Sequence, residues 1–407
     1  MTQTMRVLAA ALGLLLALAS HSIAAPYAEM VMDARTGEVL RSRNADARLH
    51  PASLTKMMTL YVAFEAVRRG ELTLDTPVRV SRNAAAEPPS KLGLRSGQRI
   101  ALRYLIRAAA VKSANDAATA IGEAISGSEE AFAARMTRTA RALGMESTTF
   151  RNAHGLTRSG HLSTARDMTV MGRRLFFDYP EYYNLFSRRQ TDANVARVRN
   201  TNRRLLDAYP GADGIKTGYT NAAGFNLVAS AERNGVRVIA TVFGGRSTAT
   251  RNARIVELFD MGFDRAPRHA AVRRPAPPTY GEVASVGPAA PERSARPPMR
   301  PGADGIVVAL GVARPEPRGE IVTRQSTSGG RVYGITLDRQ PSRYAADRLL
   351  LRTALQELEA LEDALRQVSP VRGGFEPSFV GLSQREAQRA CIRLQAQAID
   401  CSVTIGS

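Results

Sequence analysis

Strand and helix patterns of apolar residues follow one another along residues 27–265, and they predict one mixed α/β (α+β) unit. Residues 27–33 and 37–40 are two apolar-rich stretches separated by an Asp-Ala-Arg-Thr-Gly turn, which is typical of a hairpin. Two longer stretches, 225–230 and 236–243, are rich in β-branched residues and are joined by an Arg-Asn-Gly turn. We therefore expect each pair of stretches to form adjacent strands.

Helical spacing of apolar residues dominates the region between these strands. Residues 53–69 carry apolar side chains almost all round the predicted helix, so we expect it to be buried, and Gly70 ends it. An alanine-rich helix opens at or just after Ser113 and ends near Gly127. Further helices are expected at 129–143, at 164–177 and, after the strands, at 251–261.

The first 24 residues have the pattern of an export signal. A short start with one positive charge is followed by an apolar run from Val7 to Ala19, which is too short to span a bilayer comfortably. Ser22 and Ala24 place small residues three and one positions before a cleavage point. We expect a cleaved signal peptide over residues 1–24 and a periplasmic protein; an uncleaved N-terminal anchor is the alternative.

The composition changes after residue 265. Residues 266–304 are rich in Pro, Ala, Arg and Gly, which predicts an extended, solvated linker at a domain boundary. Residues 305–407 return to strand and helix patterns and predict a small α+β module with its core at about 330–407. Its expected strands are 332–337, 379–382 and 400–405, and its expected helices are 343–364 and 383–396. This order suggests an internally duplicated fold with helices on one face of a sheet.

A strong positive charge is the unusual feature of the composition. The 407-residue chain has a formal net charge of +19, whereas its hydrophobic fraction of 44% is ordinary for a globular protein. Such charge is one mark of nucleic-acid binding. Here the excess is arginine-rich and scattered rather than arranged in one stripe, and an exported protein meets anionic membrane and wall surfaces. We therefore expect no nucleic-acid partner.

The cysteines and histidines predict no metal site and no cofactor. Cys391 and Cys401 are the two cysteines. The oxidising compartment that an exported protein reaches permits a disulfide between them. Their spacing alone does not establish the geometry of a bridge, so both states remain open. The five histidines are widely separated, and they show no metal-ligand spacing with one another or with the cysteines.

Three short strings carry the candidate chemistry. They are Ser53-Leu-Thr-Lys56, Ser113-Ala-Asn115 and Lys216-Thr-Gly218. Each string alone occurs by chance in chains of this length. Together and in this order, within one predicted domain, they form the signature of serine acyl-transferases that handle penicillin and peptidoglycan.

The residue types in these strings suit acyl transfer. Ser53 is the candidate nucleophile, and Lys56, three residues later on a helix, lies on the same face and can accept its proton. A lysine acts as a base only if its pKa is lowered, and burial and the second cation Lys216 both do that. The N–H of Ser53 belongs to a first helical turn and can face a developing oxyanion. Ser113 could relay the proton to the leaving amine, and Asn115 could hold the substrate backbone and the lysine head.

The third string suits substrate binding, because it is expected on or at the end of a strand that can pair with an extended peptide. Thr217 and a nearby cation would hold a substrate carboxylate, and Gly218 leaves room for a close backbone approach. A Ser-His-Asp hydrolase is the competing class of enzyme. The chain has no G-x-S-x-G elbow, and we interpret His154 and His161 as parts of a turn-rich loop at the site rim rather than as a general base.

Residues 27–265 resemble the low-molecular-mass penicillin-binding proteins, the serine-type D-alanyl-D-alanine carboxypeptidases. The resemblance is carried by Pro51-Ala-Ser-Leu-Thr-Lys-Met-Met58, Ser113-Ala-Asn-Asp-Ala117, Asn152-Ala-His-Gly155, Ser163-Thr-Ala-Arg-Asp-Met168, Asp213-Gly-Ile-Lys-Thr-Gly-Tyr-Thr220 and Ala223-Gly-Phe-Asn-Leu-Val-Ala-Ser230. It implies a catalytic domain over 25–265 with the penicillin-binding/β-lactamase-like transpeptidase fold, an antiparallel sheet flanked by helices plus an all-α region.

The same resemblance implies a function and further site residues. Ser53 would be acylated by a peptidoglycan pentapeptide stem ending in D-Ala-D-Ala, the last D-Ala would leave, and water would hydrolyse the acyl-enzyme. β-Lactams would acylate the same serine as inhibitors. The backbone N–H groups of Ser53 and Tyr219 would form the oxyanion hole, and Arg251 would lie near the substrate carboxylate. Some members carry Asn-Arg-Asn upstream of Lys-Thr-Gly, whereas this chain has Asn200-Thr-Asn202, which leaves open how the carboxylate is held.

The C-terminal module is similar to SPOR domains, which bind peptidoglycan glycan strands that lack stem peptides. Residues 379–387 and 400–405 carry this likeness. It implies a glycan-binding module in place of the β-rich domain and amphipathic anchor of well-known relatives, with peripheral wall or membrane contact. A structural appendage without a ligand is the alternative.

Three other functions compete with the carboxypeptidase, and of these the endopeptidase stays open. A non-catalytic wall-binding or β-lactam-sensing protein would not need every motif residue that is present. A β-lactamase would need an extra acidic base for deacylation, and we find no convincing one. An endopeptidase that cuts crosslinked stems would use the same residues with a longer leaving group.

Overall fold

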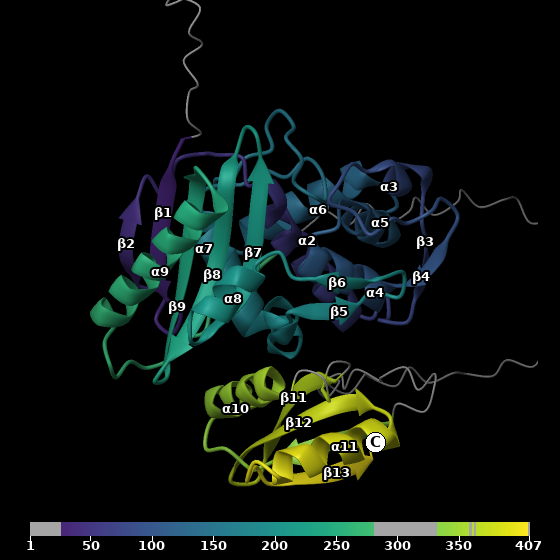
Figure 1. The fold of residues 1–407 in the computed structure, drawn as a ribbon, viewed down its shortest axis with the longest axis vertical. Coiled ribbons are helices and arrows are strands. Elements are labelled where there is room, and N and C mark those ends of the chain that lie inside the picture. Colours follow the sequence, from purple (N-terminus) through teal and green to yellow (C-terminus); the bar gives the residue numbers. More distant parts are fainter. Residues whose placement is uncertain (1–25, 281–331, 358–359, 362–363, 406–407) are drawn as a thin grey trace, which may run out of the picture.

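The computed structural model describes residues 26–280, 332–357, 360–361 and 364–405. The signal peptide expected over residues 1–24 and much of the expected linker therefore lie outside the described residues. Figure 1 shows two units, a larger one built from residues 26–280 and a smaller one built from the C-terminal residues.

A five-stranded antiparallel sheet organises the larger unit, with strand order β2-β1-β9-β8-β7. Its strands are β1 (Ala28–Asp33), β2 (Val39–Arg43), β7 (Ala212–Thr220), β8 (Gly224–Arg233) and β9 (Val236–Gly245). The expected hairpin, the expected strand pair and the strand next to it are confirmed. Because β7 ends the strand order, one of its edges has no strand partner in this sheet.

Both faces of this sheet are covered, and alternation along the strands decides which side chain faces which helix. Leu227 and Ala229 of β8 share a core with Leu258 and Phe259 of α9 (Thr248–Arg265). Val228, between them, belongs to the other core, together with the buried residues of α7 (Ala165–Asp178). The near-continuous apolar pattern of these strands is therefore explained by burial on both faces.

A helical region lies beside the β7 edge of the sheet (Figure 1). Its central helix is α2 (Thr55–Arg68), whose residues 55–66 are all buried, as the apolar pattern predicts. A 3-10 turn, η1 (Ala52–Leu54), precedes it, so the expected helix from Ser53 starts with a tighter turn. The other elements of this part are α3 (Arg82–Ala86), α4 (Leu102–Arg107), the π-helical η2 (Ala108–Lys112), α5 (Asn115–Ser126) and α6 (Glu129–Ala142).

Short elements complete the larger unit. The hairpins are β3 (Pro77–Arg79) with β4 (Arg99–Ala101), and β5 (Gln190–Asp192) with β6 (Arg197–Arg199). The remaining helices are η3 (Pro180–Ser187) and α8 (Arg203–Ala208). The closing helix expected at 251–261, α9, is longer at both ends. It begins earlier because Ser247 and Thr250 form a capping box at its start, and it ends at Arg265.

The smaller unit has the order β10 (Tyr333–Leu337), α10 (Arg343–Gln356), β11 (Leu365–Val371), β12 (Gly374–Leu382), α11 (Gln384–Gln395) and β13 (Cys401–Ile405). Its antiparallel sheet has strand order β11-β12-β10-β13, the βαββαβ arrangement of ferredoxin-like folds. Leu350 of α10 and Leu394 of α11 share one core with Ile335 and Phe379 of the sheet. The expected duplication with both helices on one face is therefore present.

Two expectations for this unit were wrong in detail. The helix expected over 343–364 ends at Gln356, and the strand β11 was missed. Pro370 lies within β11, and a proline weakens the local signal for a strand because it cannot donate to a β-ladder. In the structure β11 is the outermost strand of its sheet, where a proline is tolerated.

Cys391 of α11 and Cys401 at the start of β13 are joined by a disulfide, which answers the question that their spacing left open. The bridge ties the last strand of the smaller unit to the helix before it. It therefore closes the C-terminal part of this unit covalently.

The two units are in contact at the start of α10. Arg348 forms an ion pair of 2.8 Å with Glu232 at the end of β8, and Asp347 forms one of 2.7 Å with Arg274. Residues 267–280 have no regular secondary structure and run along the larger unit, where Arg273 N–H donates to the carbonyl of Arg35. This stretch is the described part of the expected linker.

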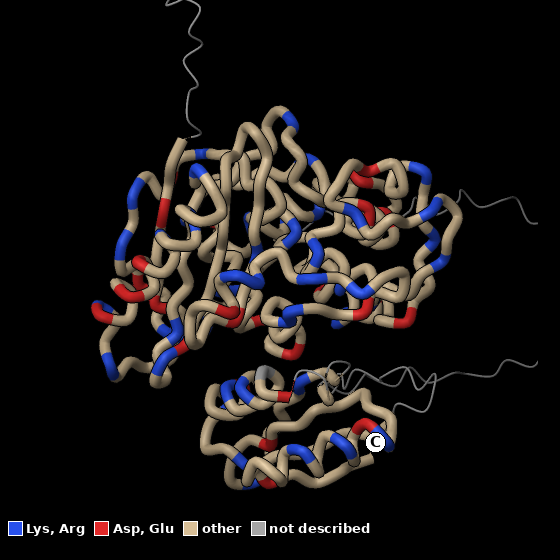
Figure 2. Tube along the Cα trace, in the orientation of Figure 1, with Lys and Arg blue, Asp and Glu red and all other residues tan. Residues whose placement is uncertain are grey.

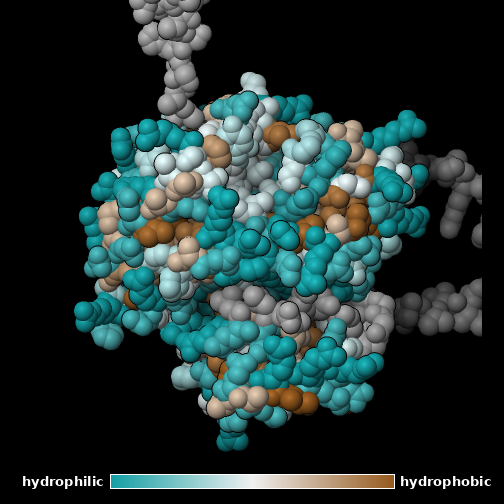
Figure 3. Space-filling view, viewed as in Figure 1, coloured by the Kyte–Doolittle hydropathy of each residue, from teal (hydrophilic) through white to brown (hydrophobic). Residues whose placement is uncertain are grey.

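Basic residues are spread along both units and alternate with acidic ones, so they form no single stripe (Figure 2). The face in Figure 3 is mostly hydrophilic, with small separate apolar groups on both units. Within the described residues, no helix combines the length and apolar character needed to cross a membrane.

Candidate active site

The candidate nucleophile and base meet at the junction of η1 and α2. Ser53 is the second residue of η1, and Lys56 lies in the first turn of α2. The Nζ of Lys56 lies 3.2 Å from the Oγ of Ser53, within hydrogen-bond distance. The expected contact between residues three apart is therefore present.

Lys56 has three polar neighbours, and their chemistry defines the state of its amine. Besides Ser53, Nζ donates to Oδ1 of Asn115 at 2.7 Å and to the carbonyl oxygen of His154 at 2.8 Å. A neutral amine has two hydrogens and one lone pair. The two pure acceptors take the hydrogens, which leaves the lone pair directed at the Ser53 hydroxyl.

Burial and charge favour this neutral amine. Lys56 is fully buried, and burial together with the nearby Lys216 ammonium holds its pKa well below the usual value. Glu87 and Asp116 act in the opposite direction and limit the decrease. The site thus supplies the condition that the sequence argument required of a lysine base.

Ser113 follows the π-helical η2 in a left-handed conformation, with φ of 66°. Among the described residues its buried Oγ has no hydrogen-bond partner. A buried hydroxyl without a partner costs stability, so it needs an explanation, and a place for a substrate group supplies one. π-Helical insertions are also frequent at functional sites.

Asn115 is fixed by its own neighbours. Its Nδ2 donates to the carbonyl of Pro88 at 2.8 Å, and its backbone N–H donates to that of Ser90 at 2.7 Å. The next residue, Asp116, accepts backbone N–H groups from residues 92–94. The amide oxygen that Lys56 contacts therefore belongs to a well-anchored side chain.

The Lys-Thr-Gly string lies within β7, against the turn that carries the nucleophile. A Cβ on Gly218 would lie 3.0 Å from both the Pro51 carbonyl oxygen and the Ser53 nitrogen. Only glycine fits this approach without a shift of the backbone. Tyr219, the next residue, is 52% exposed and packs on Phe225.

Lys216 and Arg251 place two basic side chains in the inner part of the site. Both side chains are buried, and burial together with the Arg251 charge lowers the pKa of Lys216 to about 7. Burial also lowers the pKa of Arg251 to about 10. Lys216 Nζ donates to the carbonyl of Thr217, and Arg251 donates to that of Asn226.

Thr201, in the string that departs from Asn-Arg-Asn, contacts the candidate site directly. The Oγ1 of Thr217 donates to the Oγ1 of Thr201 at 2.7 Å. Asn200 and Asn202 hold this segment through hydrogen bonds to the carbonyls of Phe186 and Gly214. Sequence reasoning noted the departure but did not place Thr201 next to Thr217.

His161 is buried behind the nucleophile helix rather than at its rim. Its Nδ1 accepts the N–H of Arg151 and its Nε2 lies 2.9 Å from Oγ1 of Thr55, so Nε2 carries the proton of a neutral ring. Burial, followed by the charges of His154 and His50, lowers its pKa to about 3. The hydrogen-bond partners of this ring are Thr55 and Arg151 rather than Ser53. Its position supports the interpretation that His161 is not a general base.

His154 is also buried, and its ring contacts two carboxylates that the sequence analysis did not single out. Its Nε2 lies 3.2 Å from Oε1 of Glu87 and 3.3 Å from Oε1 of Glu129. These three are the group of described residues whose ligand atoms lie close enough to hold a metal ion. They come from three distant segments, so no local motif could have indicated the cluster.

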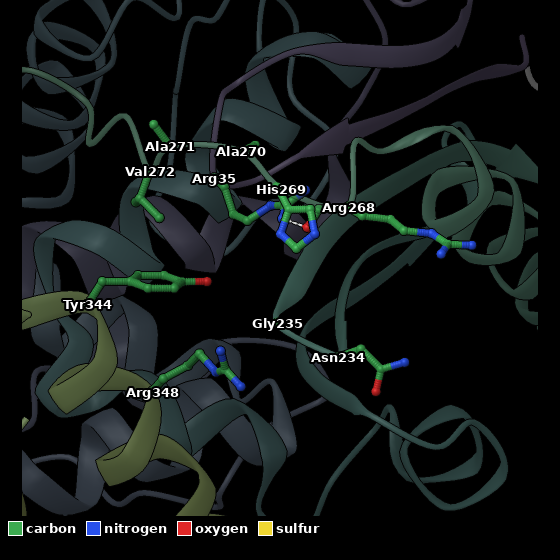
Figure 4. A pocket seen from close by; sticks show the side chains of 10 residues that line it. All are labelled: Arg35, Asn234, Gly235, Arg268, His269, Ala270, Ala271, Val272, Tyr344 and Arg348. Atoms are coloured by element: carbon green, nitrogen blue, oxygen red, sulfur yellow. Dashed lines mark hydrogen bonds between the residues drawn. The ribbon is translucent and has the colours of Figure 1, made fainter.

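A hollow elsewhere contains none of the candidate residues (Figure 4). It lies at the contact between the two units, with Arg35 and the turn at Gly235 on one side and Tyr344 and Arg348 of α10 on the other. Arg35 is paired with Asp33 and Arg348 with Glu232, so these two charges are already balanced.

The fold and this site are those of the penicillin-binding class of proteins, and comparisons with known proteins support this. The H. influenzae structure described as penicillin-binding protein 5 is 35% identical, with a TM-score of 0.57, covering 60% of this chain and 71% of that chain. Penicillin-binding protein D2 from Listeria monocytogenes, in its ampicillin-bound form, is 32% identical with a TM-score of 0.51. The match covers 58% of this chain and 96% of that chain.

A family model described as D-alanyl-D-alanine carboxypeptidase, peptidase S11, matches residues 17–247, and the chain belongs to this family. The match includes every candidate residue except Arg251, which follows it closely. The D-alanyl-D-alanine carboxypeptidase DacF of Bacillus subtilis (strain 168) is 38% identical over 250 residues, or 60% of this chain. The matched part spans 64% of that relative's length.

Proposed function

We propose that the chain is a penicillin-sensitive serine D,D-carboxypeptidase that removes the terminal D-Ala from peptidoglycan pentapeptide stems. The observation that carries this proposal is the environment of Lys56, a buried amine with two acceptors and one serine hydroxyl as its partners. Family membership and the ampicillin-bound relative support it.

In acylation, Ser53 Oγ attacks the carbonyl carbon of the penultimate D-Ala while its proton passes to Lys56 Nζ. General-base help of this kind contributes about 10²–10⁴-fold. The oxyanion is held by the backbone N–H groups of Ser53 and Tyr219. The C–N bond then breaks, the leaving amine takes a proton through Ser113, and D-Ala departs. Water hydrolyses the ester with Lys56 as base, which regenerates Ser53.

Substrate binding uses the free edge of β7 and the groups beside it. An extended stem peptide adds to this edge as a further strand, since backbone pairing at a sheet edge needs no side-chain match. The substrate carboxylate lies at Thr217, with the Thr201 hydroxyl and the Arg251 charge nearby. Asn115 holds the substrate backbone. No metal ion or cofactor takes part in this scheme.

The remaining segments suit a wall enzyme of the periplasm. Residues 1–24 direct export, 25–265 carry the activity, 266–304 link the units, and 305–407 bind glycan strands that lack stem peptides as a SPOR-like module. The βαββαβ order supports this role, as does the exposed outer strand β13. A pull-down on amidase-treated and untreated sacculi tests it, and equal binding to both would refute it.

Release of D-Ala from a purified pentapeptide tests the catalytic proposal. We expect release by the purified chain, none by the Ser53→Ala variant, and none after pre-incubation with penicillin. Release that persists in Ser53→Ala would refute the proposal. A penicillin adduct without D-Ala release would shift the assignment to crosslinked stems, the endopeptidase alternative.

A further inference from the structure

Three side chains, two of them buried and one largely buried, meet near Lys56. Among the described residues, they form no hydrogen bond or ion pair with the candidate substrate-binding residues. Glu87 follows α3, Glu129 begins α6, and His154 lies between α6 and α7. His154 and Glu87 are 5% and 8% exposed, and the Glu129 side chain is 12% exposed. Burying charged groups costs free energy unless they are paired, so this cluster calls for a role.

We propose that Glu87, Glu129 and His154 form a buried positioning cluster that holds the His154 carbonyl against Lys56 and so aims the amine at Ser53. The inference rests on the proposed function, in which Lys56 is the base. It adds three positioning residues to that function, none of which contacts the substrate.

The ring of His154 is fixed at both nitrogens. Nε2 donates its proton toward the two carboxylates, and Nδ1 accepts the backbone N–H of Leu156 at 3.1 Å. Burial alone would lower the pKa of His154, but the hydrogen bonds to Glu129 and Glu87 outweigh it and raise the pKa. The Nε2 proton is thus held firmly between the two carboxylates.

Each carboxylate is in turn held by a second donor. The hydroxyl of Thr119 donates to Oε1 of Glu87 at 2.9 Å, and the N–H of Ala153 donates to Oε1 of Glu129 at 3.2 Å. The cluster therefore connects α5, α6 and the loop that contains His154 into one arrangement.

The main chain transmits this arrangement to Lys56. The His154 carbonyl accepts from Nζ at 2.8 Å, and Gly155 follows it with φ of +92°. A Cβ at Gly155 would lie 1.8 Å from the Ala52 carbonyl oxygen, so this loop packs directly on the nucleophile turn. Losing the ring anchor would let the carbonyl move away from Nζ, and the lone pair would lose its direction.

The cluster also acts on Lys56 through charge. Glu87 and Asp116 face Lys56 and raise its pKa. Burial and Lys216 lower this pKa. His154 adds positive charge only when it is doubly protonated. Because a base works best with a pKa near the working pH, the Glu87 charge keeps the lysine from becoming too weak.

The test measures the rate of Ser53 acylation by a fluorescent penicillin from pH 5 to 10, on the full chain. The variants are Glu87→Gln, Glu129→Gln and His154→Asn. Glu130→Gln is the matched control, because it neutralises an exposed carboxylate next to Glu129 on the same helix. We expect the maximal rate to fall about 10–100-fold in the first three variants and to stay unchanged in the control.

The pH profile separates positioning from general loss of structure. Removing the Glu87 charge lowers the pKa of Lys56, so the rise of the rate with pH should move to lower pH in Glu87→Gln only. Unchanged rates and midpoints in folded variants would overturn the inference. Should a variant fail to fold, Thr119→Val keeps both carboxylates and removes one hydrogen bond; a several-fold slower acylation supports the inference and an unchanged rate overturns it.

Two further outcomes have distinct meanings. Absence of acylation in the unmodified chain would refute the proposed function itself, and the cluster's role with it. Normal acylation of the unmodified chain that a chelator abolishes would overturn the positioning role alone, because the cluster would then hold a metal ion. Unaffected acylation in the presence of the chelator supports it.

Discussion

The Nζ of Lys56 donates a 2.7 Å hydrogen bond to Oδ1 of Asn115, a side chain that is itself anchored to the carbonyl of Pro88. This contact directs one amine hydrogen away from Ser53. Together with the His154 carbonyl, it leaves the lone pair for the serine hydroxyl. The relationship ties the second sequence string to the first and explains why both are needed.

Substitution Asn115→Asp should shift the pH profile of acylation upward. It places a negative charge within hydrogen-bond distance of Nζ, which stabilises the ammonium form and raises the pKa of Lys56. Since the base works only when neutral, the rise of the rate should move to higher pH. Penicillin acylation from pH 5 to 10 measures it, with Asn234→Asp in the exposed β8–β9 turn as control. A shift to lower pH in Asn115→Asp would contradict the account.

Substitution Lys216→Gln should move the same profile in the same direction. The Lys216 ammonium lowers the pKa of Lys56, so its removal lets that pKa rise. Because the pKa of Lys216 is itself about 7, the native effect weakens above neutral pH. Acylation rates across pH check this expectation. An unchanged midpoint would show that burial alone keeps Lys56 neutral.

Gly218→Ala should slow acylation about 10-fold while lowering the melting temperature only slightly. The new methyl would meet the Pro51 carbonyl oxygen and the Ser53 nitrogen, both backbone atoms that cannot rotate away. The nucleophile turn must therefore shift by a few tenths of an ångström, which is less than the displacement of about 1 Å that costs about 100-fold. Stopped-flow acylation and thermal unfolding measure the two quantities. Full activity in this variant would mean that the close approach is not needed.

Thr201→Arg should lower KM for peptides that end in a free carboxylate. Thr201 is exposed and touches Thr217, so an arginine there can reach the proposed carboxylate site. A charge-assisted hydrogen bond is worth about 1.5–3 kcal/mol, which corresponds to roughly a 10-fold or larger decrease in KM. Thr201→Gln is the uncharged polar control. Equal KM values in both variants would place the carboxylate elsewhere.

Replacing Cys391 and Cys401 with serine should destabilise the smaller unit alone. Opening a loop of this size removes about 3 kcal/mol of stabilisation in the chain-entropy account. We expect the thermal transition of this unit to fall while the rate of penicillin acylation stays unchanged. If the rate of penicillin acylation fell together with this thermal transition, the two units would unfold together.

The larger unit was predictable because its signals are local. The apolar helix 53–69, the hairpin at 27–40 and the β-branched pair around residue 235 each contain their own pattern and turn. The three motif strings identified the candidate residues for the same reason. The contact between Lys56 Nζ and Ser53 Oγ agrees with the expectation that residues three apart on a helix can touch.

What sequence reasoning missed depends on contacts between distant segments. Glu87, Glu129 and His154 lie in unrelated local contexts, and only the packing of α6 and its neighbours brings them together. Thr201 stood out as a departure, yet its hydrogen bond to Thr217 required the fold. Strand β11 contains Pro370, which its position at the sheet edge accommodates, and edge position is a property of the whole sheet.

The central claim is that Ser53, activated by Lys56, forms a covalent acyl-enzyme with the stem peptide. Rapid-quench mass spectrometry of the purified chain with a pentapeptide ending in D-Ala-D-Ala tests it most directly. The account predicts a transient adduct with the mass of the peptide less its terminal D-Ala, located on Ser53 and absent in Ser53→Ala. Release of D-Ala without an adduct, or with an adduct on another residue, would contradict it.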